Sequence, residues 1–333
     1  MFKRKRIDQL HINSTFVVPD KKEALSYVLL DKRFLHVGDI INFNLYFKRE
    51  LTQMSLFLQS DTVIDQAQKQ RLQQVEQIFA SNSEYHKYEI FVESRLQNLL
   101  HDTSLTMDEK TEIIYTSSTK LTHSLYDNPD ALENSQRSEK IVTPILQSII
   151  YNDYTVASYM KIIEHDYYTH THSLNVSIYT LCLGAELGLK EEELISLGRA
   201  GLLHDLGKSK IKYEVINKNG VLSQEEFQEM KKHSSFGYDA ALNIGIDDKD
   251  ILDGIRHHHE KLDGKGYPDG LKAHEISLFP RIIGICDIFD ALTTKRSYKE
   301  SMHSFNALQI MKLEMNTHLD MNILDVFIKM LHE

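Results

Sequence analysis

The sequence predicts a mainly α-helical protein in two parts, a small N-terminal α+β domain over residues 1–130 and an all-α bundle over residues 131–333. Three observations lead to this prediction. Short runs of β-branched and aromatic residues occur near the start of the chain. From about Asp65 onward, apolar residues recur at helical spacing. The segment Asn128-Pro129-Asp130 interrupts that helical pattern with turn-forming residues, so we place the domain boundary there.

The N-terminal domain contains four runs that predict short β-strands. They lie at residues 15–18, 27–30, 41–47 and 54–58, separated by breaks that contain proline, aspartate or glycine. In the third run, Phe43, Leu45 and Phe47 alternate with less apolar residues, as expected of a strand with one buried face. Helices are predicted to follow at residues 66–80, 84–100 and 107–125, with Ser83 as the N-cap of the second.

The C-terminal domain shows helical periodicity throughout. A long helix is predicted over residues 131–164. Further helices are predicted at residues 176–187, 191–203, 223–244, 251–258, 280–292 and from 305 to the end. Because strand patterns are missing from this part of the sequence, we expect an all-α bundle.

Charge and composition exclude several classes of function. The net charge of -10 means that the surface as a whole does not attract a nucleic-acid polymer or an anionic membrane. No stretch approaches the roughly 20 apolar residues that a membrane-spanning helix needs, so membrane insertion is not expected. The basic start at residues 3–6 is followed by polar residues, which does not fit a secretion signal. Cys182 and Cys286 lie in apolar helical patterns, as free core residues of a cytoplasmic protein would.

Histidine is frequent, with 17 residues, and several histidines follow or begin predicted helices. His204 and Asp205 follow the helix predicted at residues 191–203, so both side chains emerge at its end. A neutral imidazole and a carboxylate that can bridge suit a site of two divalent metals. Taken alone this pair is weak evidence, because most such pairs are surface residues or helix caps. The other histidines that support the metal interpretation are His172, His233 and the run His257-His258-His259, which Glu260 follows.

Two carboxylates in the helix predicted at residues 280–292 complete the pattern. Asp287 lies between Cys286 and Ile288, where burying a carboxylate is costly unless it is paired or binds a metal. Asp290 follows close to one helical turn later and is predicted to orient a metal ligand. Each residue alone has an ordinary explanation as a core histidine, a cap or part of a solvated surface. Their combination on successive helices favours a metal site.

Together these residues resemble the HD-GYP family of cyclic di-GMP phosphodiesterases, a subgroup of the HD hydrolase superfamily, over residues 152–330. The matching residues are, in order, His172-Ser173, His204-Asp205 with Gly207-Lys208, His233, His258-His259-Glu260, Asp263-Gly264, Gly266-Tyr267-Pro268, and Asp287 with Asp290-Ala291-Leu292-Thr293. The resemblance implies an HD-type helical bundle in the C-terminal domain. It also implies hydrolysis of cyclic di-GMP to pGpG, with GMP as a further product, in bacterial signal transduction.

The resemblance further implies a binuclear metal site. In that family Asp205 would bridge two divalent ions, usually iron and sometimes manganese. The implied ligands are His172, His204, Asp205, His233, His258, His259 and Asp287. Members with a third metal carry a glutamate four residues before the His-Ser pair. This chain has Tyr168 at that position, so we predict two metals.

Several residues are predicted to act on the substrate. Lys208 would stand beside the phosphate and share the catalytic role with Asp205. The loop Gly266-Tyr267-Pro268 shapes the nucleotide pocket in the family and contacts GGDEF diguanylate cyclase domains. Arg296 and Lys299 resemble positions that hold phosphate or guanine, and an arginine fork suits either group. Ser297 departs from the usual Arg-Pro-Tyr-Lys run, which leaves the pose of Arg296 open.

Other functions stay open at this point. The chain could be a cyclic dinucleotide receptor with little turnover that signals through protein contacts at the Gly266-Tyr267-Pro268 loop. It could instead be another HD-superfamily enzyme, such as a nucleotidase or a phosphodiesterase for a mixed GMP-AMP cyclic dinucleotide. The N-terminal domain carries no phosphate loop or cofactor motif. We treat a regulatory role or a homodimer contact for this domain as a hypothesis.

Overall fold

The computed structural model describes residues 27–50, 53–103, 105–151, 155–165, 171–218, 220–294 and 302–332. Its packing divides the chain into one unit that ends at Arg95 and a second that begins at Leu96. The boundary predicted at residues 130/131 falls later than this division, because helix α3 (Met107–Asp127) packs on α4 (Asn134–Tyr151) within the second unit.

The N-terminal unit contains two antiparallel sheets. The larger has the strand order β1-β6-β3-β4, formed by β1 (Tyr27–Leu30), β6 (Ile78–Ser81), β3 (Leu45–Glu50) and β4 (Gln53–Leu58). A small second sheet pairs β2 (Ile40–Ile41) with β5 (Thr62–Val63). The strands predicted at residues 27–30 and 54–58 are confirmed. The run at residues 41–47 contributes to two strands, and the strand predicted at residues 15–18 lies outside the described residues.

The helix predicted at residues 66–80 is wrong over its last part. Helix α1 covers only Gln66–Gln74, opened by a reciprocal capping box between Asp65 and Gln68. Val75 is extended, and the chain continues into β6, where Ile78 pairs with Leu30 and with Phe47. Pairing with strands distant in the sequence overrides the helical periodicity of the glutamine-rich segment.

An aromatic cluster forms the core of the N-terminal unit. The buried Phe43 ring meets Tyr88 and Phe91 edge to face, each at a centroid distance of 5.7 Å. Both partners belong to α2 (Tyr85–Leu99), close to the helix predicted at residues 84–100. The Tyr88 hydroxyl accepts a hydrogen bond from the Asp31 backbone N–H at 2.9 Å, so the polar end of this ring is also satisfied.

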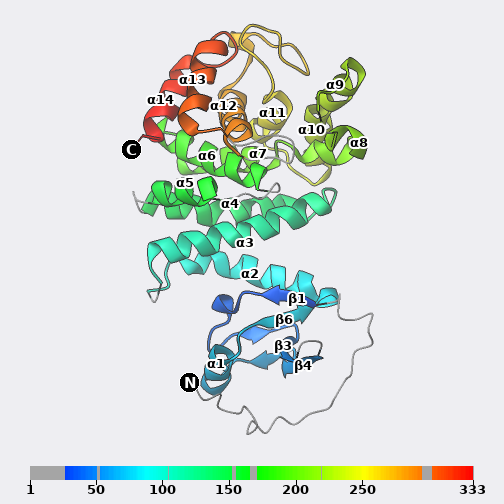
Figure 1. Ribbon diagram of the computed structural model, residues 1–333, viewed down its shortest axis with the longest axis vertical. Coiled ribbons are helices and arrows are strands. Elements are labelled where there is room, and N and C mark those ends of the chain that lie inside the picture. Colours follow the sequence, from blue (N-terminus) through cyan, green and yellow to red (C-terminus); the bar gives the residue numbers. More distant parts are fainter. Residues whose placement is uncertain are drawn as a thin grey trace. The chain divides into compact units, whose positions relative to one another are not determined.

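The second unit is the expected all-α bundle (Figure 1). After α3 and α4, its helices are α5 (Thr155–His165), α6 (His172–Glu186), α7 (Glu191–Leu203), α8 (Tyr213–Ile216), α9 (Gln224–Lys231), α10 (His233–Asn243), α11 (Lys249–His257), α12 (Leu278–Thr293), α13 (Ser304–Glu314) and α14 (Met321–Met330). Short 3-10 helices lie at Leu206–Lys210 (η4) and Ala273–Glu275 (η5). The segment predicted as one helix over residues 131–164 forms α4 and α5, with residues 152–154 between them outside the described part.

Helix α6 lies at the centre of the bundle, where it packs on α7, α12 and α14. Its residues are buried without a break from Ser173 to Gly184. Tyr179 of α6 packs edge to face with Phe289 of α12 and Phe327 of α14, at centroid distances of 5.4 and 5.9 Å. A helix that is buried on every side holds its first residue, His172, in a fixed position.

Helix boundaries in the second unit place the candidate ligands. The segment predicted as one helix over residues 223–244 divides at Lys232 into α9 and α10. Ser223 and Glu226 open α9 with a capping box, while His233 becomes the first residue of α10. Because of this division, the buried His233 side chain lies at the start of α10.

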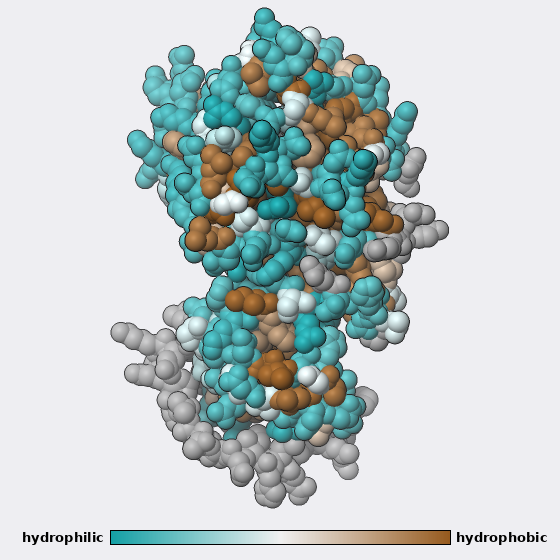
Figure 2. Space-filling view, turned by 180° about the vertical axis from the view of Figure 1, so that it is seen from behind, coloured by the Kyte–Doolittle hydropathy of each residue, from teal (hydrophilic) through white to brown (hydrophobic). Residues whose placement is uncertain are grey.

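Hydrophilic residues cover most of the face shown in Figure 2, with hydrophobic residues exposed in small groups between them. Among the large hydrophobic side chains, Val221, Tyr213 and Leu132 are the most exposed, and they belong to separate segments. Scattered exposure of this kind is normal for a globular surface. In the described part of the chain, no helix combines the length and apolar character needed to cross a bilayer.

Candidate metal centre

The candidate ligands lie at the ends of helices that pack together. Helices α7 and α12 contact each other and both contact α6 and α11, while α10 contacts both α11 and η4. His172 and His233 begin their helices, while His204 and His258 follow directly after theirs. Gly207 makes the approach of η4 to α10 possible, because a Cβ there would lie 2.0 Å from the His233 carbonyl oxygen.

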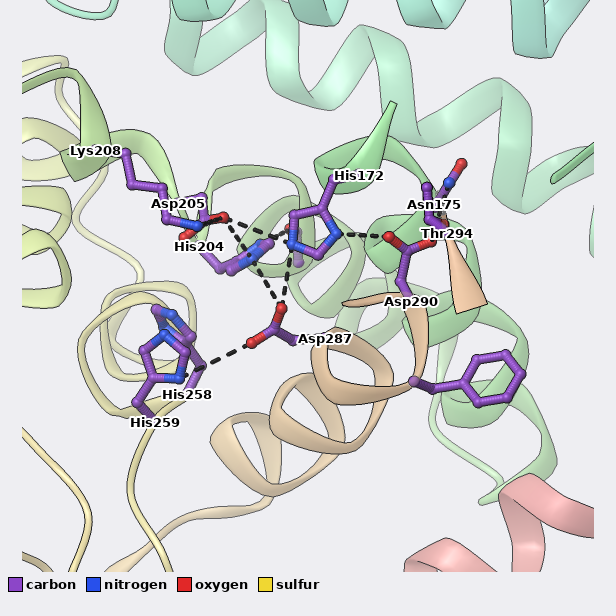
Figure 3. A network of polar contacts seen from close by, with 12 residues as sticks. His172, Asn175, His204, Asp205, Lys208, His258, His259, Asp287, Asp290 and Thr294 are labelled. Atoms are coloured by element: carbon purple, nitrogen blue, oxygen red, sulfur yellow. Dashed lines mark hydrogen bonds and ion pairs between the residues drawn. The ribbon is translucent and has the colours of Figure 1, made fainter. Parts of the chain in front are cut away.

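One group of ligands consists of His172, His204 and Asp287. The His172 Nε2 lies 3.1 Å from the Asp287 Oδ1, and the His204 Nε2 lies 3.9 Å from the same oxygen. The three ligand atoms are within 4.8 Å of one another, as the ligands of a single ion would be. In Figure 3 these side chains converge from three different helix segments.

A second group consists of His233, His258 and His259. Their ligand atoms also lie within 4.8 Å of one another. The Nε2 atoms of His233 and His258 are 3.3 Å apart. Asp287 reaches this group too, with its Oδ2 at 3.9 Å from the His259 Nδ1 (Figure 3).

Asp205 lies between the two groups and directs one carboxylate oxygen to each. Its Oδ2 lies 3.3 Å from the His204 Nε2 and 3.6 Å from the His172 Nε2. Its Oδ1 lies 3.5 Å from the His233 Nε2. The side chain is almost fully buried. This is the position that a bridging carboxylate needs between two cations.

Backbone hydrogen bonds fix the orientation of three imidazoles. In each, Nδ1 lies 2.7–2.8 Å from the carbonyl oxygen three residues earlier; the pairs are His204 with Gly201, His233 with Met230, and His258 with Ile255. A carbonyl oxygen can only accept, so Nδ1 carries the hydrogen. Each Nε2 is therefore left with a lone pair directed into the cluster, which is the form that binds a metal.

His172 is oriented by a carboxylate instead. Its Nδ1 lies 2.6 Å from the Asp290 Oδ2. Asp290 is fully buried and also accepts hydrogen bonds from the Asn175 Nδ2 and the Thr294 Oγ1, each at 3.0 Å. The expectation that Asp290 orients a ligand fits this geometry. Asn175 and Thr294 were not predicted from the sequence, although each lies close to one helical turn from His172 or Asp290.

The cluster holds neutral imidazoles beside charged groups. Burial lowers the pKa of His259 to about 3, and burial with the neighbouring His259 lowers the pKa of His258 well below its usual value. Burial alone would also lower the pKa of His172, but the carboxylates of Asp287 and Asp290 reverse this and raise it to about 9. Burial disfavours the charged form of Asp205, yet its histidine and lysine neighbours hold the carboxyl pKa well below its usual range.

Several polar atoms in the cluster have no hydrogen-bond partner among the described residues. They are the buried Nε2 atoms of His172 and His204 and the Oδ1 of Asp205. In addition, the Nε2 atoms of His233 and His258 face each other with two lone pairs, an unfavourable contact unless a cation lies nearby. Buried polar groups are normally satisfied, and divalent cations would satisfy all of these atoms at once. The residues present therefore fit a metal centre.

A positive group and a tightly held loop border the cluster. The Lys208 Nζ lies 2.5 Å from the Asp205 Oδ2, and its side chain remains 33% exposed. The Tyr267 ring packs on His259 at a centroid distance of 4.7 Å. Gly266 is required beside it, because a Cβ there would lie 2.4 Å from the Glu260 Cα. Pro268 follows in the same loop.

Other predicted residues lie outside the described part of the chain: Arg296, Ser297 and Lys299, together with Tyr168. Phe227 and Lys231 of α9, which lie beside Tyr267, were not predicted from the sequence either. Their signal in the sequence is weak, because one phenylalanine and one lysine in a charged helix are unremarkable until the fold places them. The candidate metal ligands predicted from the sequence lie close together, in groups whose ligand atoms are within 4.8 Å of one another.

Comparisons with known proteins agree with this arrangement. Residues 148–323 match the HD domain family. A protein of Pseudomonas aeruginosa named cyclic di-GMP phosphodiesterase PA4108 is 33% identical over 199 residues, which cover 60% of this chain and 48% of that protein. A protein of Vibrio cholerae named 3'3'-cGAMP-specific phosphodiesterase 3 is 30% identical over 239 residues, which cover 69% of this chain and 50% of that protein. The chain thus spans about half the length of these curated relatives.

Among solved structures, Bd1817, described as an HDG"Y"P protein from Bdellovibrio bacteriovorus, superposes with a TM-score of 0.65. The match covers 92% of this chain and 100% of that chain at 19% sequence identity, so it supports the fold alone. The family match covers the helices that carry the histidines. This chain belongs to the HD domain family.

Proposed function

We propose that this chain is a metal-dependent phosphodiesterase that hydrolyses cyclic di-GMP to pGpG, with GMP as a further product. One observation carries the proposal: the Asp205 carboxylate lies between two groups of histidines, with one oxygen toward each. The name of the Pseudomonas aeruginosa relative supports the choice of substrate.

The proposed centre holds two divalent ions. His172, His204 and Asp287 would bind one ion, His233, His258 and His259 the other, and Asp205 would bridge them. Mixed imidazole and carboxylate ligands favour iron or manganese over magnesium, which prefers oxygen alone. When bound, such ions make water a stronger acid near neutral pH and neutralise charge on a phosphoryl group.

The protein's own groups would position the substrate. Lys208 places an ammonium group at the edge of the cluster, where it can meet an anionic phosphate that the net charge of the chain does not attract. Burial and then the nearby Asp287 raise the pKa of Tyr267, so its phenol stays protonated and can donate a hydrogen bond to the substrate. We propose Gly266, Pro268, Arg296 and Lys299 as further contacts.

A second candidate is hydrolysis of a mixed GMP-AMP cyclic dinucleotide. The Vibrio cholerae relative that covers 69% of this chain carries that specificity in its name. Both substrates present the same phosphodiester chemistry to the metals, so specificity depends on contacts with the bases.

The decisive experiment is anaerobic purification with metal analysis, followed by incubation with cyclic di-GMP or 3'3'-cGAMP and Mn(II) or Fe(II). We expect about two metals per chain and formation of pGpG, and Asp205→Ala should lose both metal and turnover. A metal-loaded protein that binds cyclic di-GMP without cleaving it would favour the receptor function. A third metal at full occupancy would contradict the binuclear assignment.

Interaction partners are a separate proposal. The Gly266-Tyr267-Pro268 loop is the proposed contact for GGDEF-domain proteins. The N-terminal unit is the proposed homodimer contact. We propose that the protein acts in the cytoplasm. Light scattering of the full chain, alone and mixed with a GGDEF domain, tests both contacts. A monomeric mass for the chain alone would exclude the homodimer, and a mixture without a heavier complex would exclude the GGDEF contact.

A further inference from the structure

Two side chains of α9 reach the loop beside the metal centre. Phe227 meets the Tyr267 ring edge to face at a centroid distance of 6.3 Å, and Tyr267 in turn packs on His259. The Lys231 Nζ lies 5.0 Å from the centre of the Phe227 ring and 5.4 Å from that of Tyr267. We call Phe227, Lys231 and Tyr267 the aromatic-lysine cluster.

Core packing does not account for Phe227. Its side chain is 44% exposed, and its helix has no buried residue. The neighbouring residues of α9 are charged or amide side chains, apart from Met230. A large ring that is 44% exposed on such a helix, and that contacts the residue packed on His259, offers aromatic surface to a ligand.

Lys231 differs from the lysines around it. Lys232 pairs with Glu229 at 2.6 Å, and Lys218 pairs with Glu226. Within the described residues Lys231 forms no ion pair, and its ammonium group is held by two aromatic rings instead. A cation without a carboxylate neighbour is available to an anionic or carbonyl-bearing ligand.

We propose that the aromatic-lysine cluster binds one nucleobase of the substrate. The base would stack on Phe227, while Lys231 would face a carbonyl or phosphate oxygen of the same nucleotide. Stacking of one base on an aromatic side chain strengthens binding by roughly 5- to 150-fold. This inference rests on the proposed function and makes α9 a determinant of affinity for nucleotide diesters over diesters without bases.

The test compares two substrates in the metal-loaded full-length protein: cyclic di-GMP and bis(p-nitrophenyl) phosphate, a diester without nucleobases. For Phe227→Ala we expect the ratio of kcat/KM between the two substrates to fall at least about fivefold, mainly through KM for cyclic di-GMP. Lys231→Gln should lower the same ratio, whereas Phe227→Tyr, which keeps an aromatic ring, should leave it close to the wild-type value. Matched controls are Phe305→Ala, at a phenylalanine that is 69% exposed on α13, and Lys232→Gln.

Several outcomes overturn the inference. An unchanged ratio in Phe227→Ala excludes base binding, and a parallel loss on both substrates with a lower melting temperature shows that the cluster only ties α9 to the loop. Cleavage of bis(p-nitrophenyl) phosphate without cleavage of a cyclic dinucleotide means that the proposed function fails. In that case equilibrium binding of cyclic di-GMP tests the cluster. Weaker binding of cyclic di-GMP by Phe227→Ala than by the wild type supports base binding at the cluster. Equal binding by the two proteins overturns it, and so does a wild type that does not bind cyclic di-GMP.

Discussion

The Nδ1 of His172 and the Oδ2 of Asp290 lie 2.6 Å apart, although 118 positions separate the two residues in the sequence. Asp290 is fully buried and is itself held by Asn175 and Thr294, so the imidazole has little freedom to rotate. This contact directs the His172 Nε2 toward Asp287 and Asp205. It links the core of the bundle to the candidate metal centre.

Replacing Asp290 with asparagine should weaken metal binding without removing a metal ligand. The amide removes the negative charge beside His172. It also offers one acceptor oxygen, whereas the carboxylate offers two oxygens to the donors of His172, Asn175 and Thr294. We expect a loss of about 10- to 100-fold in metal affinity. Competition with a chelator measures it. Asp325→Asn, at an exposed residue that pairs with Lys312, is the matched control, and equal affinity of Asp290→Asn and wild type would contradict the role.

The stability of the metal-free protein should depend on His172 in a defined pH range. Burial opposes protonation of this imidazole, but Asp287 and Asp290 raise its pKa to about 9, above the ordinary histidine value of 6.5. A raised pKa in the folded state gives stability that is fully present below pH 6.5 and is lost as the pH rises through 9. Denaturant unfolding of chelator-treated protein should therefore show that the free energy of unfolding falls more between pH 6 and 9.5 for the wild type than for His172→Gln. Parallel curves would refute the prediction.

Lys208→Gln should reduce catalysis more than metal binding. The ammonium group contacts Asp205 but is not among the candidate ligands, so its loss removes positive charge from the proposed phosphate position. We expect kcat to fall about 100- to 1,000-fold. Lys210→Gln is the matched control in the same 3-10 helix. The Lys210 Nζ lies 2.6 Å from the Asp130 Oδ2, and this ion pair is not part of the cluster. Steady-state kinetics with parallel metal analysis separate the two effects, and an unchanged kcat in Lys208→Gln would assign it a structural role.

Sequence patterns predicted the helices of the bundle better than the sheet. Helical periodicity depends on neighbouring residues, which is why α3 and α7 begin where predicted. Strand β6 was missed because its pairing with β1 and β3 joins residues more than thirty positions apart. Residue types and spacing likewise indicated the candidate ligands that the fold brings together. They could not reveal that three imidazoles are fixed by backbone carbonyls, or that Phe227 lies beside Tyr267, because both depend on how helices pack.

Glu260 holds the loop that carries Tyr267, and its replacement should loosen that loop. Its Oε1 accepts hydrogen bonds from the backbone N–H groups of Asp269 and Gly270, at 2.7 and 2.9 Å, and its Oε2 accepts one from Leu271 at 3.0 Å. In Glu260→Gln, one of the two carboxylate oxygens becomes a donor, so at least one N–H group loses its acceptor. Hydrogen bonds to a charged group contribute about 1.5–3 kcal/mol each, so the loop conformation that these bonds hold should become measurably less populated.

We expect Glu260→Gln to raise KM for a cyclic dinucleotide and to increase amide hydrogen exchange at Asp269, Gly270 and Leu271, with the metal content unchanged. Glu275→Gln is the matched control, since Glu275 accepts a single hydrogen bond from the Lys272 N–H at 2.8 Å in the same loop. If exchange at these amides stays as slow as in the wild type, the loop is held by other contacts. The ion pair between Arg256 and Asp269, at 2.8 Å, would then be the next contact to remove.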